Sequence, residues 1–264
     1  MLNLPPADHS PLDQPPLPLV VAQARFSSPV QEITQDVVAR FQAGLHEAGF
    51  DFGRVVSVEM GDIIIGPGAR PTSSDRLSGV QLTSQDGAWM VTLMPGSVSL
   101  ETPSFSSFSG QFGPLLGHVL RLATDVVGPV ILTRAGLRFV NVLRRPEVEG
   151  GWSRWVRPSL VAAHSDELIG AGLVSQSQQL LFDVAAGIKR AVRAGGAEID
   201  GKEGFLLDID TFSEPASLWL LGNAIAVFDD LNRSGVALFQ ALVTPEMLSH
   251  LGSGDKEVEA GHHD

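Results

Sequence analysis

Apolar residues recur along the first half of the chain with two different periods. Alternation with a period of two predicts strands, and recurrence near every 3.6 residues predicts amphipathic helices. The expected strands cover residues 17–26, 54–65, 77–84, 88–94, 97–101 and 130–143. The expected helices cover residues 30–47 and 105–127, and the second becomes regular from Pro114, a proline suited to a first helical turn.

The second half repeats the same two kinds of pattern. A helix is expected over 152–163, strands over 172–184, 188–194 and 205–212, and helices over 215–232 and 236–242. Gly195-Gly196 and Asp200-Gly201 predict turns between the strands. Thr244, Pro245 and Glu246 predict the capped start of a last short helix.

Strands in meanders separated by long helices predict an α+β fold rather than a doubly wound parallel sheet. We expect antiparallel sheet meanders with long helices packed on one face, and two similar halves remain an open alternative. The predicted organisation is a disordered arm (1–16), an N-terminal α+β half (17–146), a C-terminal α+β half (152–251) and a disordered tail (252–264). The charged, Pro- and Gly-containing stretch 146–151 is the expected boundary.

Composition restricts the classes of function. The chain has 264 residues, 44% of them hydrophobic, no cysteine and a formal net charge of −12. Disulfides and thiolate sites are therefore excluded, and the negative charge disfavours nucleic acid as a partner. No apolar run reaches the ~20 residues of a membrane span. The N-terminus lacks the features of a signal peptide, so we expect a cytoplasmic protein without membrane attachment.

Three arginines along one predicted strand form the first candidate site. Arg134, Arg138 and Arg144 are separated by even numbers of residues, so they share a face, with Gly136 between the first two. Arginines beside a glycine could receive a phosphate or a carboxylate. The alternative is an exposed strand face on which these arginines pair with acids of a neighbouring strand.

Asp208 and Asp210 form the second candidate site, again two apart on one strand and therefore on one face. Paired carboxylates can hold Mg²⁺ or divide acid and base roles. The alternative is that they pair with Arg134 and Arg138 across the sheet, in a network that links the two halves.

Trp152 and Trp155 follow the expected boundary and alternate with arginines. Tryptophan and arginine are enriched at interaction hot spots, so this cluster is a candidate interface. The competing interpretation is that the two indoles pack one half of the chain on the other.

Familiar catalytic motifs are missing. The chain has no HExxH, no G-x-S-x-G and no phosphate-binding loop, and Gly66 to Arg70 is expected to be a turn. His262 and His263 lie in the expected tail, where nothing fixes them as metal ligands. We therefore name no catalytic residue, no metal site and no cofactor.

Several segments together resemble a sporadically distributed bacterial family of uncharacterised proteins. Its hallmark is a central strand with the pattern R-x-G-L-R-[YF]-x-N, matched here by Arg134, Gly136, Leu137, Arg138, Phe139 and Asn141. LPLVVAQARF, FLLDIDTF and FQALVT occur around it in the same order as in the family. Phe139 replaces the family's usual tyrosine, so any role of that hydroxyl is absent here. The resemblance implies a shared fold and, through the family's patchy distribution, an accessory or defence-related setting.

These observations favour a non-catalytic interaction module of an accessory bacterial system, acting on another protein or by self-association. The residues assigned to a ligand-binding site or a structural charge network are Arg134, Arg138, Asn141, Asp208 and Asp210. Two alternatives stay open: a metal-dependent hydrolase or nuclease that uses Asp208 and Asp210, and a binder of anions or small ligands.

Overall fold

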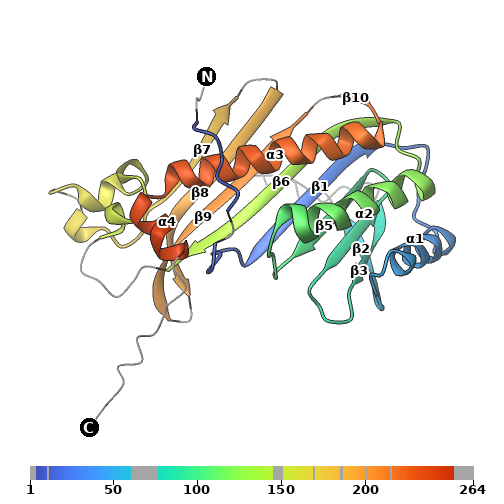
Figure 1. The fold of residues 1–264 in the computed structure, drawn as a ribbon, viewed down its shortest axis with the longest axis horizontal. Helices are drawn as coiled ribbons and strands as arrows, with labels where there is room; N and C mark the ends of the chain where they lie inside the picture. The colour runs from blue at the N-terminus through green and yellow to red at the C-terminus, as the bar shows by residue number, and fades with distance from the viewer. Residues whose placement is uncertain are drawn as a thin grey trace, which may run out of the picture.

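A computed structural model describes residues 4–10, 12–60, 77–144, 151–168, 170–184, 187–199, 201–214 and 216–252. Within these residues, ten strands form one antiparallel sheet, accompanied by four α-helices and several short helical turns (Figure 1). The predicted α+β class and the antiparallel meanders are therefore confirmed.

The elements follow one another in a simple order. The strands are β1 (Leu19–Ser27), β2 (Arg54–Met60), β3 (Leu77–Thr83), β4 (Met90–Met94), β5 (Ser97–Thr102), β6 (Ile131–Leu143), β7 (Ser177–Asp183), β8 (Ile188–Ile199), β9 (Lys202–Ser213) and β10 (Ser217–Leu218). The α-helices are α1 (Gln35–Glu47), α2 (Gly113–Val126), α3 (Leu221–Leu242) and α4 (Pro245–Gly252). A π-helical turn η1 (Phe108–Phe112) and the 3₁₀ turns η2 (Trp152–Arg154), η3 (Pro158–Leu160), η4 (Ala162–Ser165) and η5 (Gly170–Gly172) complete the set.

The sheet has the order β2-β3-β4-β5-β1-β6-β9-β8-β7, with β10 paired to the start of β6. β6 lies near the middle and joins the two parts of the chain, because it pairs with β1 on one side and with β9 on the other. The expected strands are found, and the Asp86-Gly87 hairpin between β3 and β4 has Gly87 at φ +70°. The division into two halves stays a prediction.

The helix expected over 152–163 is wrong, since the segment consists of the short turns η2, η3 and η4. Contacts with the end of α3 take up its backbone groups. The amide of Arg157 donates to the carbonyl of Leu242 (2.8 Å), and the carbonyl of Trp155 accepts from the amide of Thr244 (3.0 Å). Pro158 also supplies no amide for a continuous helix.

Gly195-Gly196 does not turn the chain, because β8 continues through both glycines to Ile199 and the turn comes at Gly201 (φ +72°). The reason is close backbone approach. A Cβ atom at Gly195 would lie 2.4 Å from the carbonyl oxygen of Gln176. Gly195 therefore allows the backbone of Gln176 to approach closely, and the strand continues through it without a turn.

Two helices were expected in the last third, but a single helix, α3, covers residues 221–242. Gly235, which falls in the gap between the two expected helices, lies inside it. A Cβ atom at Gly235 would lie 3.1 Å from the ring of Phe139, so the missing side chain allows α3 to approach β6 closely. The expected helix over 30–47 also begins later, at Gln35, after Thr34 caps it.

Some expectations concern residues outside the described parts of the chain. These are the turn at 66–70, the continuation of the second expected strand to Ile65, most of the boundary at 146–151, the helix start at Pro215, and the tail with His262 and His263.

Two buried clusters stabilise the sheet. The larger one joins α1, α2 and the first half of α3 to strands β1 and β3–β6. The second joins the end of α3, α4 and the turns around Trp152 to β8 and β9. α3 lies along β6 and β9 and reaches both clusters, and Figure 1 shows it running across the sheet beside α2. Its length therefore ties the two parts of the core together.

In the described residues of the N-terminal arm, 4–10 and 12–18, no helix or strand precedes β1, yet the arm makes defined contacts. The amide of Asp8 donates to Oε1 of Gln240 (2.9 Å), and Nε2 of Gln240 donates back to the carbonyl of Asp8 (2.6 Å). Further along, the amide of Gln14 donates to Leu251 (3.0 Å), and the carbonyl of Pro16 accepts from Val142 (2.8 Å). The arm thus runs as a strap from α3 to the sheet.

The close approach at Gly235 makes a testable prediction. Gly235→Val should lower the free energy of unfolding by about 1–3 kcal/mol, because the new methyl groups would overlap the ring of Phe139. Gly222→Val is the matched control in the first turn of the same helix, where a Cβ atom meets nothing within 4 Å. Urea unfolding followed by circular dichroism measures both, and equal effects would contradict the packing argument.

Candidate functional site

The predicted charge cluster lies on β6 and β9, and the alternation of β6 sets its position. Ala135, Leu137 and Phe139 point to the helices and are buried. Arg134, Gly136 and Arg138 occupy the other face, which we call the charged face. Asp208 and Asp210 share this face because Arg138 is the register partner of Asp210 in the neighbouring strand.

The structure brings the four charged residues together as ion pairs. Arg138 binds Asp208 in a bidentate manner, with Nε–Oδ1 at 2.7 Å and Nη2–Oδ2 at 2.8 Å. Arg134 Nη2 lies 3.0 Å from Oδ2 of Asp210. A third arginine, Arg193 on β8, lies 3.2 Å from Oδ2 of Asp208. This is the lattice of cross-strand pairs that the structural alternative predicted.

Gly136 leaves room for the side chain of Arg134 in this network of ion pairs. A Cβ atom at this position would lie 2.7 Å from Nη1 of Arg134, so the guanidinium group occupies the space above the glycine. The same guanidinium carbon lies 4.7 Å from the ring centre of Phe212 on β9. Arg134 is therefore folded down onto the sheet between a glycine, an aromatic ring and Asp210.

The two carboxylates have different environments. The side chain of Asp208 is 4% exposed, against 31% for Asp210. Burial raises the pKa of the Asp210 carboxyl above its ordinary value of 3.8, and this desolvation outweighs the attraction of Arg134 at 3.0 Å. Hydrogen bonding to Asp208 raises the pKa of Arg138. Burial and pairing thus act on the pKa of Asp210 in opposite directions.

A shallow hollow of about 360 Å³ lies on the charged face beside this network. It is lined by Val21, Gln23, Arg25, Arg134, Gly136, Arg138 and Asp210. Arg25 is exposed and its Nε donates to Oε1 of Gln23 (2.8 Å). The hollow could admit an anion, although Arg134 and Arg138 already have carboxylate partners.

Metal binding at the aspartate pair has little support in this geometry. Three guanidinium N–H groups already donate to the oxygens of Asp208. No group of three or more potential metal-ligating side chains occurs among the residues that the structure describes. A divalent ion would have to displace two arginines from Asp208 and then bind beside their positive charges.

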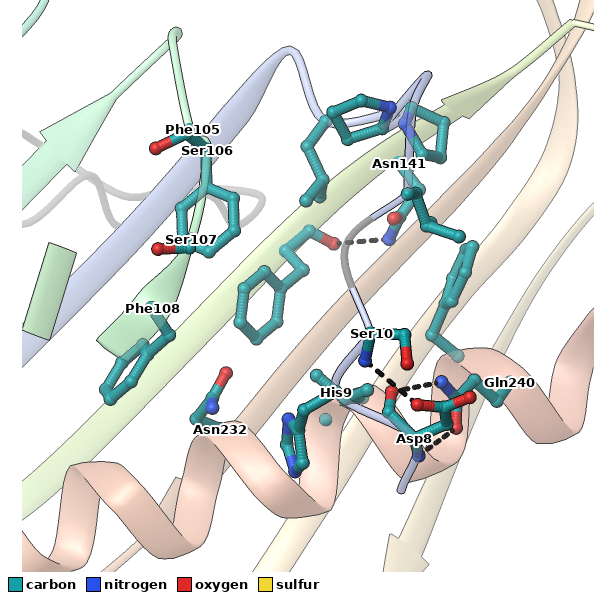
Figure 2. Close-up of a pocket in the computed structure, with 18 of the residues that line it drawn as sticks. Asp8, His9, Ser10, Phe105, Ser106, Ser107, Phe108, Asn141, Asn232 and Gln240 are labelled. Atoms are coloured by element: carbon teal, nitrogen blue, oxygen red, sulfur yellow. Dashed lines mark hydrogen bonds between the residues drawn. The ribbon is translucent and has the colours of Figure 1, made fainter. Parts of the chain in front are cut away.

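Asn141 does not belong to the charged face. It is 3% exposed on the helix side of β6, where its Nδ2 donates to the carbonyls of Phe139 (3.1 Å) and Leu207 (2.9 Å). It lines a cavity of about 150 Å³ between β6, α3 and the N-terminal strap. Figure 2 shows Asn141 and Asn232 on opposite sides of this cavity, with Phe105 and Phe108 along one flank and Asp8 to Ser10 crossing it.

Trp152 and Trp155 are each more than nine-tenths buried in the second core cluster. The ring centre of Trp152 lies 5.3 Å from that of Phe205, and its indole N–H donates to Glu203 (2.6 Å). The indoles therefore pack the turns after β6 against the sheet and α4, and they contribute little surface to a partner.

Sequence reasoning missed a buried polar group on the helix side. Arg190 is 6% exposed and its Nε donates to the hydroxyl of Ser234 (2.6 Å). Its Nη1 and the hydroxyl of neighbouring Thr211 are buried without a hydrogen-bond partner among the described residues. Burial lowers the pKa of Arg190. Strand alternation could have predicted this burial, because Arg190 lies on the same face of β8 as the apolar residues Val192 and Ala194.

The comparisons with known proteins add little. No family model matches the chain, and no curated protein sequence matches it. Among solved structures, the di-domain aromatase/cyclase StfQ from the steffimycin biosynthetic pathway aligns over 89% of this chain and 97% of its own, at 10% identity and a TM-score of 0.16. A TM-score this low bears on neither fold nor function. None of the described helices is long and apolar enough to cross a membrane.

Asp208 should be the most important carboxylate for stability. Asp208→Asn removes the hydrogen-bonded acid partner of both Arg138 and Arg193, so we expect the free energy of unfolding to fall by about 2–3 kcal/mol. Asp230→Asn, which breaks the exposed pair with Arg233, is the control and should change stability by no more than about 0.5 kcal/mol. Urea unfolding measures both, and a small effect at Asp208 would show that the network is not structural.

Asp210 should instead give a pH-dependent effect. Its pKa is raised in the folded state, so the folded protein binds the proton more tightly than the unfolded chain. The stabilisation from the protonated form is present at low pH and is lost as pH rises through the raised pKa. The stability of the natural chain relative to Asp210→Asn should therefore decrease as the pH rises from the ordinary value of 3.8 through the raised pKa. A difference that grows with pH would have the wrong sign.

Proposed function

We propose that this protein is a non-catalytic interaction module, and that it self-associates by pairing strand β7 with β7 of a second copy. The accessory or defence-related bacterial setting remains part of the proposal and depends on the family resemblance alone. We also propose that all long helices pack on one face of the sheet and that the chain consists of two similar halves.

The observation that carries the proposal is the unprotected edge at β7. Among the described strands it ends the sheet and pairs with β8 alone, and none of its seven residues is fully buried. Its sequence, SQQLLFD, contains no proline or lysine, and Leu181 is 66% exposed. Natural edge strands usually carry charges, prolines or bulges that prevent pairing. Figure 1 places β7 at the end of the sheet, away from α1 and α2.

The sequence of β7 suits pairing with itself. Antiparallel pairing centred on Leu180 would place Gln179 opposite Leu181 and Ser177 opposite Asp183, twice over by symmetry. No two like charges face each other in this register, although the chain as a whole is strongly acidic. Backbone hydrogen bonds would supply much of the affinity, as in other strand-addition complexes.

The catalytic alternative is weaker because its carboxylates are engaged. Asp208 is held by Arg138 and Arg193, and Asp210 by Arg134. The anion-binding alternative keeps one supporting observation, the hollow beside Arg25, and it ranks second for that reason.

A charge-exchange experiment tests the proposed pairing. Gln179→Lys with Leu181→Lys would place like charges opposite each other across the dimer axis, and so would Gln179→Glu with Leu181→Glu. Each double variant should be monomeric in analytical ultracentrifugation at concentrations where the natural chain is a dimer. An equimolar mixture of the two should recover the dimer, because opposite charges then face each other.

The matched control is Leu218→Lys, which adds the same charge at a residue that is 70% exposed on β10 and should leave the dimer intact. A natural chain that stays monomeric at high micromolar concentration would refute the proposal. Dimers that survive in both double variants would refute the register.

A further inference from the structure

A buried arginine on the helix side of the sheet has no acidic partner among the described residues. Arg190 on β8 is 6% exposed, and its Nε donates to the hydroxyl of Ser234 on α3 (2.6 Å). Its Nη1 is buried and makes no hydrogen bond with any residue in the described part of the chain. Burial lowers the pKa of Arg190, and no described carboxylate raises it again. The positive charge is therefore buried without compensation.

Two hydroxyl groups lie beside this guanidinium group. Thr211 on β9 is the register partner of Arg190, and the Cβ atoms of such partners lie about 4.5–5.5 Å apart. Thr211 is 0% exposed, and its Oγ1 has no hydrogen-bond partner among the described residues. A Cβ atom at Gly235 would lie 3.4 Å from this oxygen, so the hydroxyl lies against α3 next to Ser234. β8, β9 and α3 thus each contribute one polar group to the same buried place.

All three groups have hydrogens to donate. The hydroxyl oxygen of Ser234 accepts from Arg190, which leaves its own hydrogen free, and Nη1 and the hydroxyl of Thr211 are donors as well. A water molecule could accept from them but would leave the charge of the guanidinium unbalanced. A buried charge without a counter-ion is costly, and leucine at this position would avoid that cost. The cluster therefore points to an anion.

Geometry and charge restrict the class of anion. Arg138 holds Asp208 through Nε and Nη2, but Nε of Arg190 is already used by Ser234, so the same side-on binding of a carboxylate is blocked. One guanidinium balances one negative charge, and a dianion such as phosphate would bury an excess charge. The close approach of α3 at Gly235 also leaves little space. A small, spherical, monovalent ion that accepts hydrogen bonds from any direction fits these conditions.

We infer that Arg190, Thr211 and Ser234 form a binding site for a chloride ion. The ion accepts hydrogen bonds from Nη1 and from the two hydroxyls, and it fastens α3 to β8 and β9, beside which the helix runs in Figure 1. The site lies on the opposite side of the sheet from the charged face, because Arg190 and Arg193 are an odd number of residues apart. The inference does not depend on self-association through β7.

Thermal unfolding of the full chain tests the site when gluconate is exchanged for chloride at a constant sodium concentration, which keeps the ionic strength fixed. The melting temperature of the natural chain should rise by about 3–6 °C once chloride reaches about ten times its Kd, a roughly tenfold shift toward the folded state. Arg190→Leu should abolish this response and should melt in gluconate no lower than the natural chain, since it removes an uncompensated charge. Arg121→Leu, at an exposed arginine of α2, is the matched control and should keep the response.

Two further measurements decide the question if Arg190→Leu does not fold. Crystals grown in bromide should show an anomalous scattering peak within hydrogen-bond distance of Nη1 of Arg190 and Oγ1 of Thr211. Thr211→Val keeps the shape of the side chain and removes an unpaired hydroxyl, so it should melt higher in gluconate and bind chloride about 2- to 10-fold more weakly. Line broadening in chlorine-35 NMR measures that affinity.

Three results would overturn the inference. The first is a bromide crystal without a peak beside Arg190, and the second is a folded Arg190→Leu that responds to chloride like the natural chain. Either would mean that water alone bridges the three groups. The third is a Thr211→Val chain that binds chloride as tightly as the natural one, because the ion would then lie elsewhere.

Discussion

The alternation of side chains along β6 is the constraint on which the rest of the structure depends. This strand lies between β1 and β9 near the middle of the sheet, so it has no free edge and both of its faces are defined. One face gives Leu137 and Phe139 to the core, and the other gives Arg134 and Arg138 to the charged face. A shift of one residue would bury both arginines among the helices, and therefore the register is strongly determined.

Much of this arrangement could be predicted because strand alternation is a local property. The spacing of Asp208 and Asp210 was sufficient to place them on one face, and their pairing with Arg134 and Arg138 needed only the assumption that the two strands are neighbours. Local reasoning was less successful where distant backbone decides. The segment after Trp152 forms short turns and not a helix, because its backbone groups bond to residues at the end of α3. Gly235 lies inside a helix because the ring of Phe139 occupies the space that a side chain at this position would fill.

The polar groups on the helix side were not predicted, for a related reason. Asn141 was assigned to the charge network, but it lies an odd number of residues from Arg138, which puts it on the opposite face of the strand, with the phenylalanines. Arg190 and Asn232 lie in apolar patterns, where a single polar residue gives no local sign of its partner. Only the packing of α3 on the sheet brings such residues together, and that packing depends on contacts distant in sequence.

The strap is synthesised well before the two helices that hold it in place. Its anchors, Gln240 on α3 and Leu251 on α4, are separated from Asp8 and Gln14 by most of the sequence. During translation the arm leaves the ribosome long before either anchor exists. The strap therefore cannot cover the cavity between α3 and β6 until both of these helices have been synthesised.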